Sequence, residues 1–366
     1  MKRGIKIILI ALMILVLIGI ITVAVLFMQY NSNLKSVNYG KTKGRIIEVE
    51  IPTGYGISGI ASLLEEKGVI RDAFSMKIYA KLNNITNLQA GLYEFDNAKE
   101  DVEAILNRLQ KGDVKDVSIK MTFIEGKSVK DYVKVIAENT NNTEEDVLAL
   151  FEDDEYIDYL IEKYWFITED VKNDDIYYSL EGYLLPDTYT FKSKDMTAKE
   201  IIEYILDYTD KFLSDYKDDI ENSEFSIHEI LTLASVVEQE GKTAESRAEI
   251  AGVFINRLDA GMNLGSDVTT YYAFQINMAE QDLTQKQLDT TNPYNTRHSS
   301  MAGKLPVGPI CNSSKSSLDA ALSPKETDAF YFVADKNGKV YFTKNYSEHT
   351  KIIKELKAND LWYVYE

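Results

Sequence analysis

A chain of 366 residues is longer than most single domains, so we expect at least two folded units. Hydrophobic residues make up 45% and charged residues 27% of the chain, a composition typical of folded rather than disordered proteins. The net charge of −18 argues against a nucleic acid partner, because nucleic acids bind basic surfaces. The same excess of acidic residues argues against tight contact with anionic lipid headgroups.

The chain begins with a short basic segment and a long apolar run. Lys2, Arg3 and Lys6 precede an uncharged stretch from Ile7 to Met28, whose 22 residues are enough to cross a bilayer as a helix. The stretch is longer than the apolar part of a signal peptide and no Ala-x-Ala cleavage site follows it, so we expect it to remain as an anchor. By the positive-inside rule, residues 1–6 are a cytoplasmic tail of a single-pass cell-membrane protein, and all later domains lie outside the cytoplasm.

Polar residues follow the apolar run, and folded sequence begins after them. Residues 29–44 are rich in Asn and Ser, and we expect them to form a linker of little structure. Residues 45–113 have the periodicities of a small α+β unit. Strand patterns cover 45–51 and 91–95, helical spacing covers 57–67, 73–82 and 102–110, and Gly68 and Gly112 are placed to end two of these helices.

A larger unit opens with a second strand, glycine turn and helix at residues 117–138. We therefore place the domain boundary between 113 and 114, and expect one larger α+β domain over 114–366. The acidic stretch 139–159 is typical of a solvated helical surface. Near the end of the chain, Lys336-Asn337-Gly338 predicts a hairpin turn between two apolar strands.

A helix near the middle of the larger domain has clear start and stop signals. Ser226 and Glu229 are spaced as the two partners of a capping box, which predicts a helix from about Ile227. Gly241 is suited to a left-handed C-cap, so the helix should end there. Two glutamates, at 238 and 240, lie close to its C-terminal end.

Glu238 is the candidate catalytic acid. At helical spacing it belongs to the same stripe as Leu231 and Ala234, so we expect it on an apolar face. Burial raises the pKa of a carboxyl group, and an acid still protonated near neutral pH can serve as a general acid. Glu240 lies about 200° further round the helix, so the two acids should not share a site. The plainer interpretation is that Glu238 lies at the edge of the helix or forms a structural ion pair with Arg247.

The sequence around this helix resembles a known family. The run Leu233–Glu240 (LASVVEQE), then Arg247, then Val253–Met262 (VFINRLDAGM) closely resembles the YceG-like family of endolytic murein transglycosylases. In that family the first Glu of the V-E-x-E run is the catalytic acid, which implies this role for Glu238. Residues 45–113 likewise resemble the LysM-like N-terminal domain of the family.

Further segments resemble motifs of the same family. Residues 180–189 match its E-G-x-x-x-P-D-T-Y segment, residues 267–272 its D-P-T-x-x-Y segment, and residues 292–296 its P-Y-N-T run. Amide, hydroxyl and phenol groups suit sugars, which present both donors and acceptors on flat faces. The resemblance implies substrate-binding side chains in a cleft at Glu181, Asp267, Thr269, Tyr272, Asn295 and Thr296.

Three positions depart from the family motifs. Val268 replaces a proline, Arg297 stands where a tyrosine is usual, and Val307 replaces another proline. Proline restricts the backbone, so the segments that contain Val268 and Val307 have more conformational freedom than the motif would give them. We expect these departures to affect the details of the subsites and not the reaction.

The resemblance implies an enzyme that cuts peptidoglycan inside its glycan strands and leaves 1,6-anhydro-N-acetylmuramoyl ends. Glu238 would protonate the leaving oxygen and then, as a carboxylate, accept the proton of the muramoyl 6-hydroxyl as that oxygen closes on C1. The substrate supplies its own nucleophile, so no second carboxylate is required. One alternative is a lysozyme-type muramidase that uses Asp267 as second carboxylate. Another is a non-catalytic anchored module that holds glycan and recruits synthetic enzymes.

No cofactor or metal is expected. His228, His298 and His349 are too dispersed for a recognisable zinc pattern, and we expect them to be structural or solvated. Cys311 is the only cysteine, so no intramolecular disulfide can form. The resemblance implies peptidoglycan strands and the cell membrane as partners, together with peptidoglycan synthases of the elongation machinery.

Overall fold

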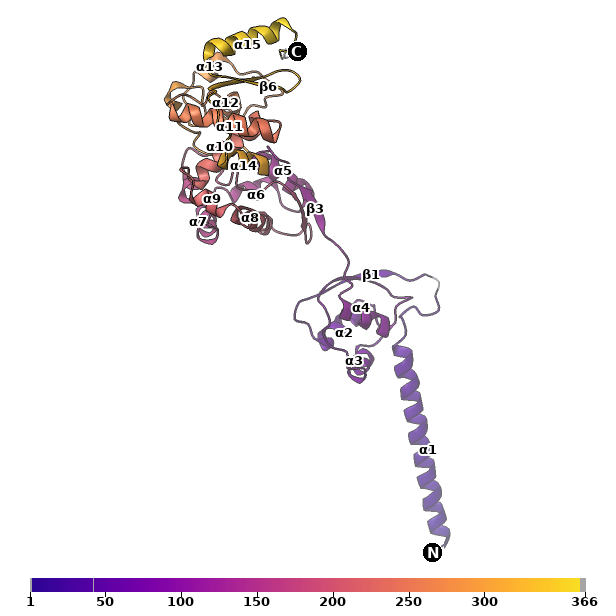
Figure 1. The fold of residues 1–366 in the computed structure, drawn as a ribbon. Helices are drawn as coiled ribbons and strands as arrows, with labels where there is room; N and C mark the ends of the chain where they lie inside the picture. Colours follow the sequence, from indigo (N-terminus) through magenta and orange to yellow (C-terminus); the bar gives the residue numbers. More distant parts are fainter. Residues whose placement is uncertain (1, 42, 363–366) are drawn as a thin grey trace. The chain divides into compact units, whose positions relative to one another are not determined.

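The chain consists of a long N-terminal helix, a small α+β unit and a larger α+β unit (Figure 1). A computed structural model describes residues 2–41 and 43–362. Its internal contacts divide the chain into Met1–Asp116 and Val117–Glu366, three residues beyond the boundary expected from the sequence. Residues 363–366, which we assigned to the larger domain, lie outside the described part. The mixture of helices and small sheets confirms the expected α+β class.

Helix α1 (Lys2–Asn33) is long and apolar enough, over Ile5–Asn33, to cross a membrane, and none of its apolar window is buried. It extends five residues past Met28, into the stretch expected as a linker. The linker prediction is wrong here, because the polar side chains find partners. Asn33 Nδ2 donates to the Ser75 hydroxyl at 3.2 Å, and the buried Ser36 hydroxyl donates to a backbone carbonyl at 2.8 Å.

The small unit is a two-stranded antiparallel sheet packed against helices. Strand β1 (Ile46–Ile51) pairs with β2 (Gly91–Asp96), with Ile46 opposite Asp96 and Ile51 opposite Gly91. The helices are α2 (Ile57–Glu66), α3 (Ala73–Leu82) and α4 (Val102–Lys111), and α4 ends at Gly112 in the left-handed conformation. The core combines apolar side chains from all five elements, among them Val49, Ile60, Met76, Phe95 and Leu106.

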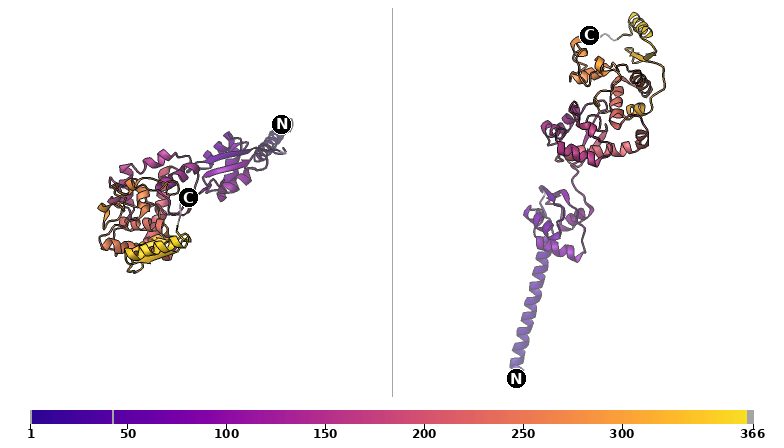
Figure 2. Two further views of the ribbon diagram at one scale, coloured as in Figure 1. Left: turned by 90° about the horizontal axis from the view of Figure 1, so that it is seen from above. Right: turned by 90° about the vertical axis from the view of Figure 1, so that its left-hand side faces the viewer.

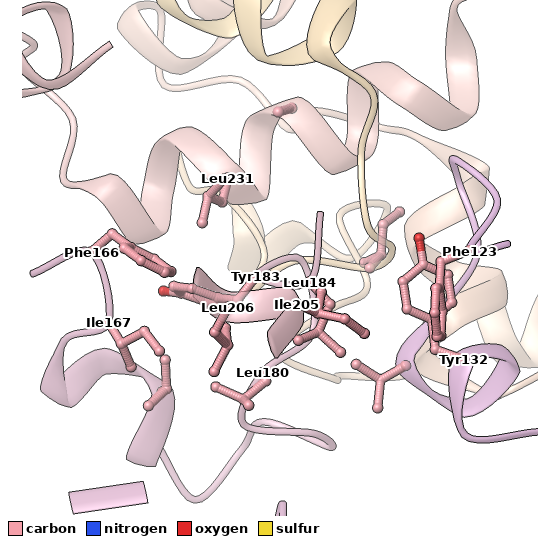
Figure 3. Packing of buried hydrophobic residues seen from close by; sticks show 14 of the residues in the cluster. Phe123, Tyr132, Phe166, Ile167, Leu180, Tyr183, Leu184, Ile205, Leu206 and Leu231 are labelled. Atoms are coloured by element: carbon pink, nitrogen blue, oxygen red, sulfur yellow. The ribbon is translucent and has the colours of Figure 1, made fainter. Parts of the chain in front are cut away.

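The first half of the larger unit surrounds a short sheet, in which β3 (Ile119–Thr122) pairs antiparallel with β4 (Thr188–Phe191). Its core includes Phe123, Tyr132, Tyr183 and Leu206. Figure 3 shows Tyr183 and Leu206 on the side of Leu231, a residue of the central helix, and Phe123 beside Tyr132 at the other end of the cluster. The helices are α5 (Val129–Asn139), α6 (Glu144–Ala149), α7 (Asp154–Lys163), η1 (Glu169–Lys172), α8 (Ala198–Ser214) and α9 (Lys217–Glu221).

The acidic stretch 139–159 is more than a solvated surface. Val147, Phe151, Tyr156 and Ile157 are buried in the main core, while the acidic side chains between them face outward. The sequence prediction was therefore incomplete, because the density of acidic residues concealed an amphipathic spacing.

Helix α10 (Ile227–Glu240) runs through the centre of the larger unit and packs against α11 (Ala244–Asp259), α12 (Asp267–Ala273) and α14 (Lys315–Leu322). The predicted capping box of Ser226 and Glu229 is present. The predicted left-handed C-cap is wrong, because Gly241 is extended at φ −100° and ψ 130°. Shorter elements, α13 (Gln285–Leu288) and η2 (Ser299–Met301), lie in the following loops.

A hairpin and a helix complete the described chain. Strand β5 (Tyr331–Ala334) pairs antiparallel with β6 (Val340–Thr343), and α15 (Tyr346–Ala358) contacts both strands; α15 is yellow in Figure 2. The predicted turn is confirmed: Gly338 has φ +85°, and the Asp335 carboxylate accepts the backbone N–H groups of Asn337 and Lys339. The hairpin also packs on α11, so it lies against the central helices.

Candidate active site

A cavity of about 1120 Å³ opens in the larger unit between the C-terminal end of α10, the loops on either side of α12, and the β5–β6 hairpin with α15. A volume of this order exceeds that of a usual small-molecule pocket, so it can hold an extended ligand. Its walls combine acids, cations and aromatic rings, among them Glu240, Arg257, Asp267, Tyr271, Arg297, Tyr331, His349 and Trp362.

Glu240, the last residue of α10, is one of the acids on the wall of this cavity. The Ser266 hydroxyl donates to Glu240 Oε1 at 2.6 Å. Burial raises the pKa of Glu240, and the Asp267 carboxylate raises it further, whereas the Ser266 hydrogen bond and the charges of Arg297 and Arg257 act in the opposite direction. Glu240 is thus a partly enclosed carboxyl group that holds its proton more tightly than an exposed glutamate does and still borders open space.

Ser266 is itself fixed by two buried threonines. The Ser266 backbone N–H donates to Thr296 Oγ1 at 3.1 Å, the Ser266 carbonyl accepts from Thr269 Oγ1 at 2.8 Å, and the two threonine hydroxyls are 2.7 Å apart. Both threonines are fully buried. They were predicted to bind substrate, but the structure places them beneath the cavity wall, where they hold the residue that contacts Glu240.

Asp267 and Arg297 form an ion pair on the cavity wall, with Arg297 Nε 2.7 Å from Asp267 Oδ1. Both side chains are about half exposed, so the pair adds little to stability. Its main consequence is electrostatic, because it places one negative and one positive charge near Glu240. Among the predicted substrate-binding residues, Asp267 is the one that lines the cavity.

Glu238 lies on the other side of α10 and does not line the cavity. Its side chain is 6% exposed, and Oε1 is 2.6 Å from Arg247 Nη2. Oε2 accepts hydrogen bonds from the backbone N–H and hydroxyl of Ser314, at 2.9 and 2.5 Å, and from the Ser317 hydroxyl at 2.7 Å. Leu231 and Ala234 of the same helix face are buried in the core as expected, whereas the Glu238 carboxylate itself is surrounded by hydrogen-bond donors. The alternative of an ion pair with Arg247 matches this geometry. The two acids occupy different sites, as the helical phase predicted.

The remaining predicted substrate residues make hydrogen bonds within the fold. Glu181 is 1% exposed, and its carboxyl group accepts from the Val129 backbone N–H at 2.9 Å and the Tyr272 hydroxyl at 3.1 Å. Burial raises the pKa of Glu181 to about 8. Asn295 is fully buried, and its amide donates to three backbone carbonyls of residues 287–290, which fastens that loop. The side chains of Glu181, Tyr272 and Asn295 do not line the cavity.

Several cavity residues were not predicted. Arg257 lies in the run that resembles the family, yet only the structure shows its guanidinium over the Tyr331 ring, 5.4 Å from the centroid. The His349 ring centre is 5.4 Å from that of Tyr331, and burial lowers the pKa of His349. The hairpin that carries Tyr331 was predicted, but nothing in its sequence indicated which surface it covers.

His228 is structural, as expected for an isolated histidine. It is buried, with Nδ1 2.8 Å from the Tyr183 hydroxyl and Nε2 2.9 Å from the Val307 carbonyl oxygen. Within residues 2–41 and 43–362, no three His, Cys, Asp or Glu side chains are grouped closely enough to hold a metal ion.

Taken together, the fold and the cavity define an α+β protein with a candidate membrane span and a site for an extended polar ligand beside an acid. The chain belongs to the YceG-like family, whose model matches residues 49–355. This match confirms the family resemblance noted in the sequence.

Two relatives and one solved structure are similar over most of the chain. The chain is 35% identical over 306 residues to the endolytic murein transglycosylase of Bacillus subtilis (strain 168), covering 83% of each chain. It is 32% identical over 328 residues to the protein of the same name from Streptococcus pneumoniae serotype 2 (strain D39 / NCTC 7466), covering 85% of this chain and 58% of that relative. The crystal structure of a yceG-like protein from Listeria monocytogenes is 38% identical, with a TM-score of 0.60, and covers 85% of this chain and 100% of that one.

Proposed function

We propose that this chain is an endolytic murein transglycosylase. It cleaves the bonds between N-acetylmuramic acid and N-acetylglucosamine within peptidoglycan strands and leaves 1,6-anhydro ends. Family membership and the names of the relatives support this function. The observation that carries it is an acid with a raised pKa, Glu240, on the wall of a cavity large enough for several sugar rings.

We assign the acid role to Glu240 in place of Glu238. A general acid must come within hydrogen-bond reach of the oxygen that it protonates. Glu240 borders the cavity and, among the residues that the structure describes, accepts one side-chain hydrogen bond, from Ser266. Glu238 is enclosed between α10 and α14, where Arg247 and two serines already donate to both of its oxygens. A sugar could reach Glu238 only if these contacts were broken.

The chemistry then requires one carboxyl group in two protonation states. Protonated Glu240 gives its proton to the glycosidic oxygen as the bond from C1 of the muramoyl residue to that oxygen breaks. The 6-hydroxyl oxygen of the same sugar bonds to C1, and its proton passes to the Glu240 carboxylate. No water is consumed, and the acid returns to its starting state. The Ser266 hydroxyl holds Glu240 Oε1 in place through both steps.

The cavity walls suit a peptidoglycan strand. The rings of Tyr271 and Trp362 line the cavity, where sugar rings can stack on them. Arg297 carries a half-exposed positive charge in a chain of net charge −18, and it can attract the carboxylates that stem peptides carry. A tyrosine, which is usual in the family at the position of Arg297, would lack this charge. We therefore propose that Arg297 replaces the tyrosine in order to recognise strands that carry stem peptides.

The location follows from the candidate span in α1. We propose that α1 anchors the chain in the cell membrane, with residues 1–6 in the cytoplasm and both folded units outside it. An anchored enzyme of this kind acts on glycan strands near the membrane. Peptidoglycan synthases of the elongation machinery are therefore the proposed protein partners.

The chemistry of the product ends tests the function. Purified full-length chain acting on uncrosslinked glycan should give internal cuts whose muramoyl ends are lighter by one water than reducing ends, by mass spectrometry. A hydrolase would instead give ends that gain two hydrogens on borohydride reduction, and Asp267, on the same cavity wall, would be its second carboxylate. A binding module would give no new ends at any protein concentration.

A further inference from the structure

Helix α3 of the small unit has an outward face that is apolar and basic. Phe74 and Leu82 are 66% and 70% exposed. Half-buried Ile78 lies between them at four-residue spacing, so the three form one stripe along the helix. Lys77 and Lys81 lie beside this stripe. The helix, AFSMKIYAKL, contains no acidic residue, although the chain has 58 of them.

This stripe does not contribute to the core of the small unit. The core side of α3 is formed by Ala73, Ser75, Met76 and Ala80, which are all buried. The exposed stripe is therefore a second apolar face on the same helix. An exposed apolar stripe rimmed by polar groups marks a contact surface more often than a chance arrangement.

The position of α3 relative to α1 indicates what it contacts. Asn33, the last residue of α1, donates to the hydroxyl of Ser75 in the first turn of α3 at 3.2 Å. Arg71, just before α3, donates to the carbonyl of Ser36 through Nη2 at 2.7 Å. In Figure 1, α3 accordingly lies at the end of α1 from which the chain continues. The exposed stripe is thus tied to the end of the candidate membrane span.

The rise of helix α1 gives the height of its contact with α3 relative to the bilayer. The uncharged run ends at Met28, and α1 continues to Asn33. Five residues of α-helix advance about 7 Å. The headgroup region of a bilayer is about 5–8 Å thick on each side of the hydrocarbon. The first turn of α3 therefore lies at the level of the lipid headgroups when the uncharged run spans the hydrocarbon.

We propose that the α3 face formed by Phe74, Ile78 and Leu82 inserts into the interface of the bilayer that α1 crosses. Lys77 and Lys81 contact the anionic headgroups of that bilayer. The net negative charge of the whole chain predicts repulsion from anionic lipid. The α3 face can still bind such lipid, because only charges within about a Debye length of the bilayer act on it, and those of α3 are positive. The proposal depends on α1 lying in the membrane and not on the enzymatic activity, so each can fail without the other.

Nitroxide accessibility in the full-length chain, reconstituted in vesicles with phosphatidylglycerol, tests the proposal. A Cys311→Ala background removes the natural thiol, and Phe74→Cys and Leu82→Cys carry the label. Ile46→Cys is the matched control, because Ile46 is also apolar and 64% exposed but lies in strand β1 and not on the α3 face. The ratio of oxygen to nickel-chelate collision rates should be several-fold higher at 74 and 82 than at 46.

Three outcomes would overturn the proposal. Labels at 74 and 82 that are as open to the chelate as the label at 46 would place the face in water. Dipolar broadening between labels at 74 would show that a second copy covers the face. A label at Val16 of α1 that is open to the chelate would remove the span on which the proposal rests.

A double variant tests the contact of the two lysines with anionic headgroups. Lys77→Gln with Lys81→Gln should lower the ratio of oxygen to nickel-chelate collision rates at 74 in phosphatidylglycerol and leave it unchanged in phosphatidylcholine. Equal ratios in both lipids would refute the contact of the lysines with the headgroups.

Discussion

Two glutamates near the C-terminal end of α10 have carboxyl groups with very different surroundings. On the α14 side, Glu238 is paired with Arg247 and accepts three further hydrogen bonds. On the cavity side, Glu240 accepts a single hydrogen bond from the described part of the chain, from Ser266, and its pKa is raised by burial. The two residues are two positions apart, so the helix turns them to different neighbours. The comparison teaches that the number of donors around a carboxylate, and not its burial alone, decides whether it suits proton transfer.

The largest expected effect is on the rate of glycan cleavage, which should distinguish Glu240 from Glu238. Glu240→Gln keeps the size of the side chain but removes the acidic proton, so the rate of glycan cleavage should fall by a factor on the order of 10² or more. Thermal unfolding should show that the fold is retained. If Glu240→Gln stays active while a folded Glu238→Gln variant is inactive, the acid is Glu238 and the assignment made here is wrong.

The second effect separates the acids by stability. Glu238→Gln leaves Arg247 as a poorly compensated, largely buried charge, so the free energy of unfolding should fall by about 3 kcal/mol. Cleavage per folded molecule should stay close to that of the parent chain. Urea unfolding of Glu238→Gln, Arg247→Gln and the double variant would measure the pair directly, because the losses should not add. Additive losses would show that the ion pair contributes nothing.

A third test concerns the charges that act on Glu240. The Asp267 carboxylate raises the pKa of Glu240 and the Arg297 guanidinium lowers it. An acid with a lower pKa loses its proton at lower pH, so Asp267→Asn should move the alkaline limb of the pH–rate profile to lower pH. Arg297→Gln should move the same limb to higher pH. Shifts in the same direction would contradict this electrostatic account, and complete loss of activity in Asp267→Asn would favour the muramidase.

The smallest effect concerns the hydrogen bond from Ser266. Its hydroxyl stabilises the carboxylate form, so Ser266→Ala should raise the pKa of Glu240 further and extend activity to higher pH. The maximal rate should fall modestly, because the carboxyl group loses its positioning contact. Ser266→Thr, which keeps the hydroxyl, serves as the control and should restore the pH profile. An unchanged profile in Ser266→Ala would show that this hydrogen bond does not act on the reacting group.

Much of the fold could be predicted because its signals are local. The capping box of Ser226 and Glu229 and the turn at Gly338 depend on neighbouring residues, and both are present. The sequence also predicted correctly that Glu238 and Glu240 face different sites. It could not predict which of them faces the cavity, because two of the donors to Glu238 are serines that come 76 and 79 residues later in the chain.

Most of the predicted substrate residues lie away from the cavity for a related reason. Thr269, Thr296 and Asn295 lie in motifs that resemble the family, and hydroxyl and amide groups suit sugars as well as they suit a buried network. The structure shows that their partners are backbone groups and one another. A motif therefore indicated the right region of the chain, while the direction of each side chain depended on packing between segments that are distant in sequence.

The extended glycine after α10 has a consequence for how this region can change over evolutionary time. A Cβ atom at Gly241 would come within 2.5 Å of Arg247 Cγ and 3.1 Å of Arg247 Cα. The backbone of Gly241 would accept any residue, so the constraint is space. A larger residue at 241 would displace Arg247 and leave Glu238 without its cation. We expect aligned sequences to vary at positions 238, 241 and 247 together, as one inherited unit, while position 240 stays fixed independently of them.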